Sequence, residues 1–352
     1  MSRLDSGKMS EALDQLEHAL AALWVPEEGA LPKARVCMGN LVFLAGVSGR
    51  ERSVELLDAL RAAETSRTFL VTIDPKLPPW ALDAQVSARC QREGERLLCS
   101  ERIDLTLGAG AIDRASSVIT SLLLPEIPST LVILEPAPAM LVTALARGAS
   151  RLVIDSDAIG IETSVEIARA TSAHLADLAW MRIYPWRNQI AGAFDDPQVR
   201  PAVSALQRLA VTTTGSHPLP PVTRLLVGWM ASRLGWTLQN PSCAIDGRHQ
   251  RILLDLQGHA VVDAPPGRLL SVEISALLGE ARMLLDLARE PHGATLQVAC
   301  TTEGLGASVA HITLADPPLL VLLDRALDDA TSDLALRQAL HAAALLLGPT
   351  PS

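Results

Sequence analysis

Two segments rich in tryptophan and arginine hold the side chains of this protein that are best suited to specific chemistry. The first runs from Asp177 to Arg187 with the sequence DLAWMRIYPWR, and the second from Leu225 to Trp236 with the sequence LLVGWMASRLGW. Together they hold four of the six tryptophans in a chain that is only 3% aromatic. Trp and Arg are enriched at the energetically important positions of protein interfaces. Neither segment contains a nucleophile–base pair, a metal-ligand spacing or a phosphate-binding glycine loop, so we expect them to serve adhesion rather than bond chemistry.

The first segment is predicted to enter a helix at Pro185, because proline is favoured at the first helical position. Trp186 and Ile190 then recur at helical spacing and share one apolar face. Arg182 precedes the proline and is expected in an extended or turn conformation. On either side of this segment we predict further helices at residues 165–178 and 201–209.

The second segment is predicted to lie in a helix that opens at Pro220 and Pro221 and ends at the C-cap Gly235. Arg233 falls in its last turn, where a cation interacts favourably with the helix dipole. Both segments are also typical of amphipathic helices that pack into a core. An interior role for the tryptophans therefore stands beside the interface role as an alternative.

The amino-acid sequences of the two segments resemble those of the OpcA family of glucose-6-phosphate dehydrogenase assembly proteins. DLAWMRIYPWR, followed by an apolar helix to Phe194-Asp195, resembles one family signature, and LLVGWMASRLGW resembles the second. Weaker similarity precedes them in the expected strands at residues 35–42, 131–135 and 151–156. The resemblance therefore extends from about Arg35 to Trp236 and is specific in the two Trp/Arg segments.

The resemblance implies a protein that is not an enzyme, has no cofactor, and binds glucose-6-phosphate dehydrogenase to promote its active oligomer. It would act in the oxidative pentose phosphate pathway. The positions that match the family signatures are Asp177, Trp180, Arg182, Pro185, Trp186, Arg187, Trp229, Arg233 and Trp236. Whether they contact the dehydrogenase or build the domain that does so is left open by the resemblance.

Sites for other chemistry are not recognisable in the sequence. Gly46-Val-Ser-Gly49 and Gly108-Ala-Gly110 each follow an expected strand, but both lack the third glycine of a dinucleotide-binding turn. The eight histidines are dispersed and form no metal-ligand pair at helical spacing. We therefore predict no catalytic, cofactor-binding or metal-binding residue. The alternative is a sugar-phosphate-binding domain or enzyme in which Arg67, Arg182 or Arg187 would bind phosphate.

Composition and charge indicate a cytoplasmic globular protein. The 352 residues are 49% hydrophobic and 20% charged, with a formal net charge of −9. This acidic balance argues against nucleic acid as a partner. The first residues lack the apolar run of a signal peptide, and no apolar stretch reaches membrane-spanning length. We therefore expect no membrane partner.

The five cysteines form no CxxC motif and no zinc-like pairing. We expect each thiol to act as a small apolar side chain in a reducing compartment. Cys90 and Cys99 are near neighbours that could face each other across adjacent strands. Because some OpcA relatives are described as thiol-regulated, the resemblance also admits a redox switch at this pair.

The alternation of short apolar strands with helices predicts an α/β fold with a Rossmann-like N-terminal domain and a mainly parallel sheet. An antiparallel pair is expected within residues 82–107. After residue 236, short runs separated by Gly, Pro and Asp predict an antiparallel sheet. We therefore expect an N-terminal helix and linker at residues 1–30, an α/β domain at 31–160 and an α+β C-terminal domain at 161–352, which carries the Trp/Arg segments.

Overall fold

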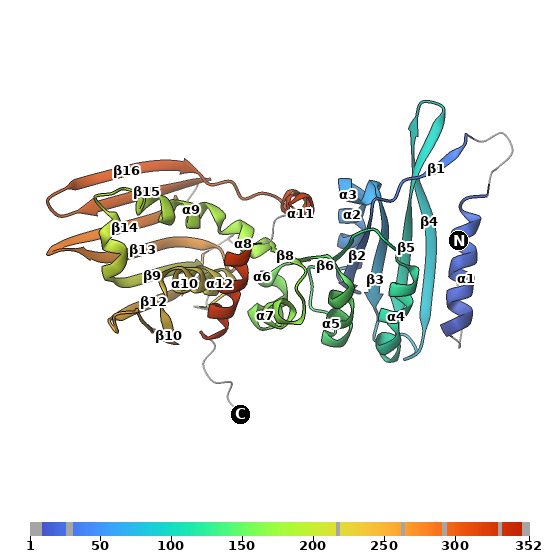
Figure 1. Ribbon diagram of the computed structural model, residues 1–352, viewed down its shortest axis with the longest axis horizontal. Coiled ribbons are helices and arrows are strands. Elements are labelled where there is room, and N and C mark those ends of the chain that lie inside the picture. Colours follow the sequence, from blue (N-terminus) through green and yellow to red (C-terminus); the bar gives the residue numbers. More distant parts are fainter. Residues whose placement is uncertain are drawn as a thin grey trace. The chain divides into compact units, whose positions relative to one another are not determined.

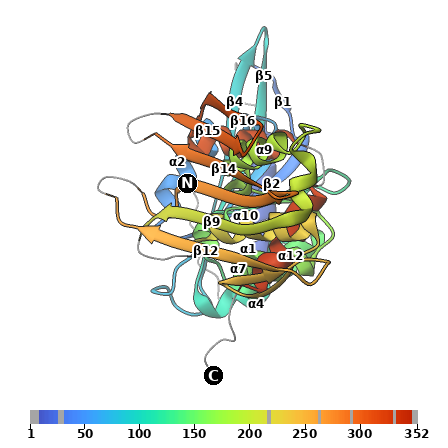
Figure 2. The same cartoon turned by 90° about the vertical axis from the view of Figure 1, so that its left-hand side faces the viewer.

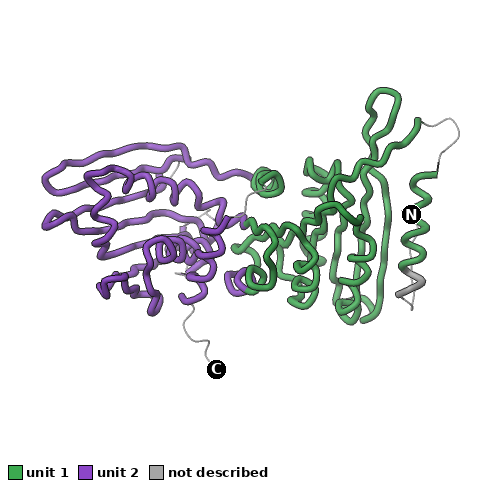
Figure 3. Tube along the Cα trace, viewed as in Figure 1, with its two compact units in different colours: residues 1–159, 166–176, 319–332 green, residues 160–165, 177–318, 333–352 purple. Residues whose placement is uncertain are grey.

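The structure, a computed structural model, describes residues 9–25, 31–215, 219–261, 265–290, 294–329 and 333–346. The linker that we expected before residue 31 lies mostly outside the described residues. The chain divides into two compact units (Figure 3). Unit 1 comprises Met1–Ile159, Glu166–Ala176 and Leu319–Ser332, and unit 2 comprises Gly160–Val165, Asp177–Pro318 and Asp333–Ser352.

Unit 1 is built on a mainly parallel sheet, sheet A, with the strand order β1-β5-β3-β2-β6-β7-β8. Parallel pairing joins β1, β5, β3, β2, β6 and β7 in that order, which confirms the Rossmann-like prediction. The strands are β1 (Lys33–Arg35), β2 (Gly39–Gly46), β3 (Ser66–Ile73), β4 (Leu82–Glu93), β5 (Arg96–Leu107), β6 (Ser129–Ile133), β7 (Arg151–Ile154) and β8 (His174–Asp177).

Helices connect the parallel strands of sheet A and pack against it (Figure 1). The central strands are buried on both faces, as expected for a parallel sheet between helices: all of Leu41–Ala45 in β2 and Phe69–Val71 in β3 are buried. The helices are α1 (Met9–Ala22), α2 (Arg50–Ala59), α3 (Arg61–Glu64), the 3₁₀ turn η1 (Ala109–Ala111), α4 (Ile112–Leu122), α5 (Ala139–Gly148), α6 (Ser156–Ile159), α7 (Ile161–Ala170) and α11 (Leu319–Asp328).

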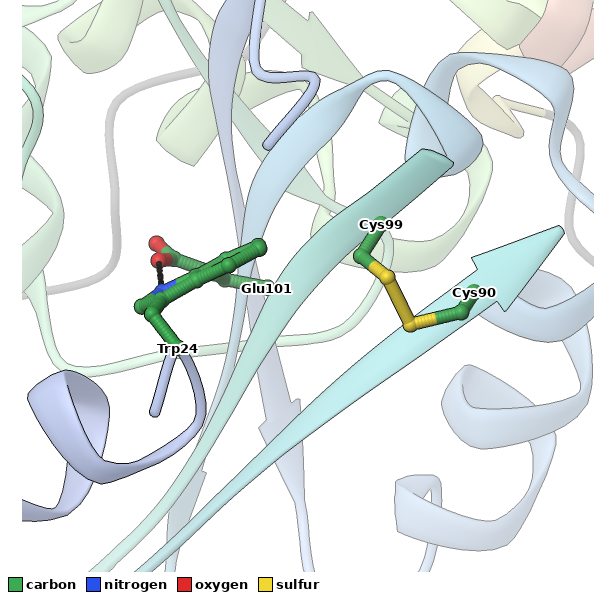
Figure 4. The surroundings of a disulfide bond; sticks show 4 residues. All are labelled: Trp24, Cys90, Cys99 and Glu101. Carbon is green, nitrogen blue, oxygen red and sulfur yellow. Dashed lines mark hydrogen bonds between the residues drawn. A yellow bond between two sulfur atoms is a disulfide. The ribbon is translucent and has the colours of Figure 1, made fainter. Parts of the chain in front are cut away.

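The antiparallel pair that we predicted within residues 82–107 is the long hairpin of β4 and β5. Its two-residue turn contains Gly94 at φ +61, and the register places Cys90 directly opposite Cys99. These residues form a disulfide with a Cα–Cα distance of 4.0 Å (Figure 4). The expectation that every cysteine is a free apolar filler is therefore wrong for this pair, because the hairpin register brings the two side chains together.

A buried carboxylate lies close to the disulfide on the same strand. Glu101 in β5 is 1% exposed and accepts hydrogen bonds from the indole of Trp24 at 2.7 Å and from Arg67 at 2.6 Å (Figure 4 shows the first). Arg35 donates to the same carboxylate at 2.8 Å. This network links the segment after α1 to strands β1, β3 and β5.

Unit 2 is built on a second eight-stranded sheet, sheet B, with the order β10-β11-β12-β9-β13-β14-β15-β16 (Figure 2). Every pairing is antiparallel except that of β12 with β9. The strands are β9 (Leu206–Thr214), β10 (Thr237–Asn240), β11 (Cys243–Ile245), β12 (Arg251–His259), β13 (Leu269–Leu278), β14 (Ala281–Arg289), β15 (Thr295–Thr302) and β16 (Gly306–Thr313).

One face of sheet B is apolar and buried, which confirms the α+β prediction for this part of the chain. In β13, Val272, Ile274 and Ala276 are buried, whereas the alternate residues Glu273 and Ser275 are only half-buried. Helices α8 (Leu178–Arg182), α9 (Tyr184–Ala193), α10 (Pro221–Leu234) and α12 (Leu334–Ala344) and the 3₁₀ segment η2 (Arg200–Ala205) complete the unit.

Three local predictions are wrong. Residues 165–178 form the end of α7 and then strand β8, because Ala173, Leu175 and Asp177 are buried at the period of a strand. Arg182 lies in helix α8 rather than in an extended segment. Residues 206–209 open the central strand β9, whose pairing on both edges overrides local helix preference.

Candidate functional site

The first Trp/Arg segment forms two short helices joined at one buried residue. Asp177 caps helix α8 through its side chain, which accepts a hydrogen bond from the Ala179 amide at 2.9 Å. Ile183, 1% exposed, ends α8 and precedes α9, and Pro185 lies in the first turn of α9 as predicted. The break at Ile183 turns the chain, so that side chains of α8 and α9 can meet.

Arg187 stacks on Trp180 across this break. The guanidinium carbon lies 3.4 Å from the centroid of the indole ring and 5.8 Å from that of Tyr184. Arg187 also donates to the Trp180 carbonyl at 3.3 Å. Burial lowers the pKa of Arg187 to about 10, and the Asp333 carboxylate opposes that shift. The guanidinium therefore stays charged at neutral pH, and its place over the indole ring favours a cation–π interaction.

Asp333 connects the first segment to helix α12. Its Oδ2 accepts a hydrogen bond from Trp180 Nε1 at 2.5 Å, and its Oδ1 accepts one from the Leu336 amide at 3.1 Å. The second bond is the N-cap of α12. Asp333 is a residue of this site that our sequence reading missed. An aspartate directly before an apolar helical run is the signal that could have identified it.

The second Trp/Arg segment packs against the same helix. It lies in α10, whose C-cap Gly235 adopts the left-handed conformation at φ +66, as predicted. Within α10, a Cβ atom at Gly228 would lie 2.3 Å from the Ala339 carbonyl oxygen and 2.9 Å from the Ala343 amide nitrogen of α12. Gly228 therefore permits α10 and α12 to approach closely, and α12 holds both Trp/Arg segments together.

The signature positions differ sharply in exposure. Trp180, Trp186 and Trp236 are buried, with exposed fractions of 3%, 1% and 9%. Trp229 and Arg182 are half-buried, and Arg233 is exposed in the last turn of α10. Three of the four signature tryptophans therefore build the core of unit 2. The solvent side of the first segment is Tyr184, which is 59% exposed.

The turn where a doubly wound fold binds phosphate is occupied by a side chain of the protein. Glu135, directly after β6, accepts a hydrogen bond from the Gly46 amide at 3.0 Å. A Cβ atom built on Gly49, the N-cap of α2, would lie 1.5 Å from its Oε1. The carboxylate thus takes the place of an anion at this helix N-terminus.

The second glycine turn is also occupied. A Cβ atom on Gly108 would lie 2.0 Å from the Pro78 carbonyl oxygen, and one on Gly110 would lie 3.0 Å from Pro79. The segment that follows β3 therefore packs directly on this turn. Arg67, a phosphate ligand in the alternative reading, is buried and donates to Glu101 and to the Leu122 carbonyl.

The described residues contain no cluster of three His, Cys, Asp or Glu side chains that could hold a metal ion. No helix in the described part of the chain is long and apolar enough to cross a membrane. The geometry of the two segments is therefore that of a Trp/Arg core, with Tyr184 and Arg233 exposed to solvent.

Two family models match successive parts of this chain. Residues 58–171 match the N-terminal domain of the glucose-6-phosphate dehydrogenase subunit described for OpcA, and residues 173–340 match the C-terminal domain of the same protein. The two matches cover most of the chain. The chain belongs to the OpcA family.

Curated relatives carry the same name. OpcA of Synechocystis sp. is 29% identical over 194 residues, which are 52% of this chain and 40% of that protein. OpcA of Nostoc punctiforme is 32% identical over 166 residues, which are 44% of this chain and 34% of that protein. The chain thus matches less than half the length of these relatives.

Solved structures with a similar fold are oxidoreductases. An oxidoreductase from Sinorhizobium meliloti has a TM-score of 0.49 and 9% identity, over 89% of this chain and 95% of that chain. KijD10, a 3-ketoreductase from Actinomadura kijaniata, has a TM-score of 0.45 and 12% identity, over 88% of this chain and 96% of that chain. Both TM-scores are below 0.5 and both identities are 12% or less, so no conclusion about this chain follows from these likenesses.

Proposed function

We propose that this protein is a non-catalytic assembly factor that binds glucose-6-phosphate dehydrogenase in the cytoplasm, promotes its active oligomer and raises its activity. The observation that carries the proposal is the match of residues 58–171 and 173–340 to two domains whose descriptions name that dehydrogenase. The dehydrogenase would perform all of the chemistry. This chain would stabilise the active assembly by binding it more tightly than the inactive one.

The occupied glycine turns support a role without a nucleotide of its own. The Glu135 carboxylate holds the Gly46 amide, which a bound phosphate would need. A negative charge at that position also repels a pyrophosphate. The Rossmann-like unit then serves as a scaffold.

Within unit 2, we assign the contact with the dehydrogenase to the solvent side of the signature segments rather than to their buried tryptophans. Tyr184 is 59% exposed and lies beside the Arg187 guanidinium. Arg233 is exposed in the last turn of α10. Exposed tyrosine and arginine are the residue types that dominate binding energy when an interface covers them.

The test is co-purification with the dehydrogenase of the same organism, followed by an activity assay with and without this chain. We expect a stable complex, higher dehydrogenase activity, and no turnover of glucose 6-phosphate with NADP by this chain alone. Tyr184→Ala should weaken the complex by about 1–2 kcal/mol, and an exposed site elsewhere, Arg248→Ala, serves as the control.

The alternative function, sugar-phosphate binding, predicts different results. A sugar-phosphate-binding protein would be thermally stabilised by glucose 6-phosphate in isolation and would leave the kinetics of the dehydrogenase unchanged. That pair of results would overturn the assembly proposal.

A further inference from the structure

The edge strand β16 differs from every other sheet edge in the described part of the chain. It has eight residues, GASVAHIT, with no Lys, Arg, Asp, Glu or Pro. All but Ile312 are exposed. Strand β16 ends the order of sheet B, so its outer row of backbone N–H and C=O groups faces away from β15.

Natural proteins protect such edges with short strands, charges, proline or covering elements. The other edges of the two sheets follow this rule. Strand β10, at the far edge of sheet B, has four residues and an irregular register. In sheet A, β8 has four residues, and the long strand β4 carries Arg89, Arg92 and Glu93 and contacts α1.

In sheet B, paired charged residues lie on the central strands rather than on the β16 edge. Arg208 in β9 donates to Asp255 in β12 at 2.5 Å and also to Glu273 in β13. By contrast, neither strand of the outer hairpin, β15 or β16, contains Lys, Arg, Asp or Glu, and His311 in β16 lies 3.2 Å from Glu290. The edge strand is therefore long, regular in register and free of Lys, Arg, Asp and Glu. An edge strand of this kind pairs readily with another strand.

We propose that β16 pairs antiparallel with β16 of a second copy of this chain and joins two copies of sheet B into one continuous sheet. A two-fold axis perpendicular to the sheet places the buried face of one copy of sheet B on the same side as the buried face of the other. The pairing must then be centred on a residue, since opposite residues share a face. Val309 and Ala310 are the two central residues of the strand.

The absence of Lys, Arg, Asp and Glu from β16 favours a second copy of this chain as the partner of the edge. An antiparallel strand that pairs with itself places only its central residue directly opposite its own copy, so a charged residue at that position would be repelled. Strand β16 avoids this, and its small residues Gly306, Ala307 and Ser308 allow close approach. A pairing centred on Val309, which is 57% exposed, would bring the two valines face to face and remove both from water.

The experiment is sedimentation velocity of the full chain over a range of concentrations. The wild type is expected to form a species of twice the chain's 37.4 kDa. Val309→Lys should raise the dimer dissociation constant by about tenfold or more, because two lysines would oppose each other. Leu284→Lys, which places the same charge on an exposed residue of strand β14, should leave the dimer intact.

Mixing Val309→Lys with Val309→Glu separates repulsion at the edge from misfolding. The mixed sample is expected to recover the dimer, because opposite charges then face each other, while each variant alone remains monomeric. A monomeric wild type, a dimeric Val309→Lys chain, or a mixture that stays monomeric would each overturn the proposal. A monomeric wild type whose Val309→Lys variant loses the dehydrogenase would assign the edge to that partner instead.

Discussion

The guanidinium of Arg187 lies over the indole of Trp180, with 3.4 Å between its central carbon and the ring centroid. The two residues come from consecutive helices, α8 and α9, which are separated by the break at Ile183. The contact joins the two helices, because the buried Trp180 and the half-buried Arg187 pack together across the break. Tyr184 then remains on the solvent side.

The contact with Trp180 predicts that lysine cannot replace Arg187. An ammonium group keeps the charge but loses the contact of the guanidinium with the ring and the bond to the Trp180 carbonyl. We expect Arg187→Lys to lower the free energy of unfolding of unit 2 by about 1–2 kcal/mol, measured by urea unfolding followed by tryptophan fluorescence. Arg233→Lys, at an exposed position, should change it by less than about 0.5 kcal/mol. Equal effects of the two variants would contradict this account.

The two acceptor oxygens of Asp333 can be separated by mutation. Asparagine has one side-chain acceptor, so Asp333→Asn can keep the cap on α12 but loses the bond from Trp180. We expect it to cost about 1–3 kcal/mol, and Asp333→Ala to cost about 1 kcal/mol more because the cap is lost as well. Thermal unfolding tests whether Asp333→Ala is less stable than Asp333→Asn. In a Trp180→Phe background, which lacks the indole donor, Asp333→Asn should cost less.

The sequence predicted the architecture well where periodicity was strong. The mainly parallel sheet of unit 1, the hairpin before residue 107 and helix α10 with its Gly235 cap were all expected from apolar spacing and from Gly and Pro positions. Each of these features depends on local residue patterns that recur in any protein. The family resemblance was also visible, since it lies in short uninterrupted segments.

Long-range contacts were the part that the sequence could not show. Asp333 is 153 residues from Trp180, and no local pattern links them. Glu135 is 89 residues from Gly46, and it fills the turn that looked like an incomplete phosphate site. Residues 206–209, which open strand β9, were predicted to be helical because their fit depends on β12 and β13, which lie later in the chain. The exposure of a tryptophan likewise follows from tertiary packing, so the spacing of Trp186 could not distinguish core from interface.

The disulfide between Cys90 and Cys99 predicts a stability that depends on reductant. Cys90 is exposed at the hairpin surface, so a small thiol can reach its sulfur atom. Reduction should lower the melting temperature of unit 1, because a cross-link of this loop size stabilises by about 2–4 kcal/mol. A Cys90→Ala/Cys99→Ala chain should start lower and no longer respond to dithiothreitol, whereas Cys37→Ser should respond like the wild type. A wild type indifferent to reductant would refute the prediction.

Gly228 should resist substitution even though alanine favours helices. A methyl group there would meet the backbone of α12, which cannot move aside as a flexible side chain can. We expect Gly228→Ala to destabilise unit 2 by about 2 kcal/mol or more, despite a propensity gain of about 1 kcal/mol. Gly192→Ala in α9 is the control, since nothing lies within 4 Å of its Cβ position, and it should be neutral or stabilising. The melting temperatures of the two variants test this prediction, because an effect of helix propensity alone would raise both of them.

Gly49 and Glu135 should be coupled, because a Cβ atom at Gly49 would overlap the Glu135 carboxylate at 1.5 Å. The backbone of Gly49, at φ −96 and ψ −2, accepts alanine without strain, so the cost lies in the displaced side chain. We expect Gly49→Ala to cost about 1 kcal/mol, the value of the lost bond to the Gly46 amide. In a Glu135→Ala background the same substitution should cost close to nothing. A double-mutant cycle by chemical unfolding measures this coupling, and strictly additive effects would show that the carboxylate does not occupy the turn.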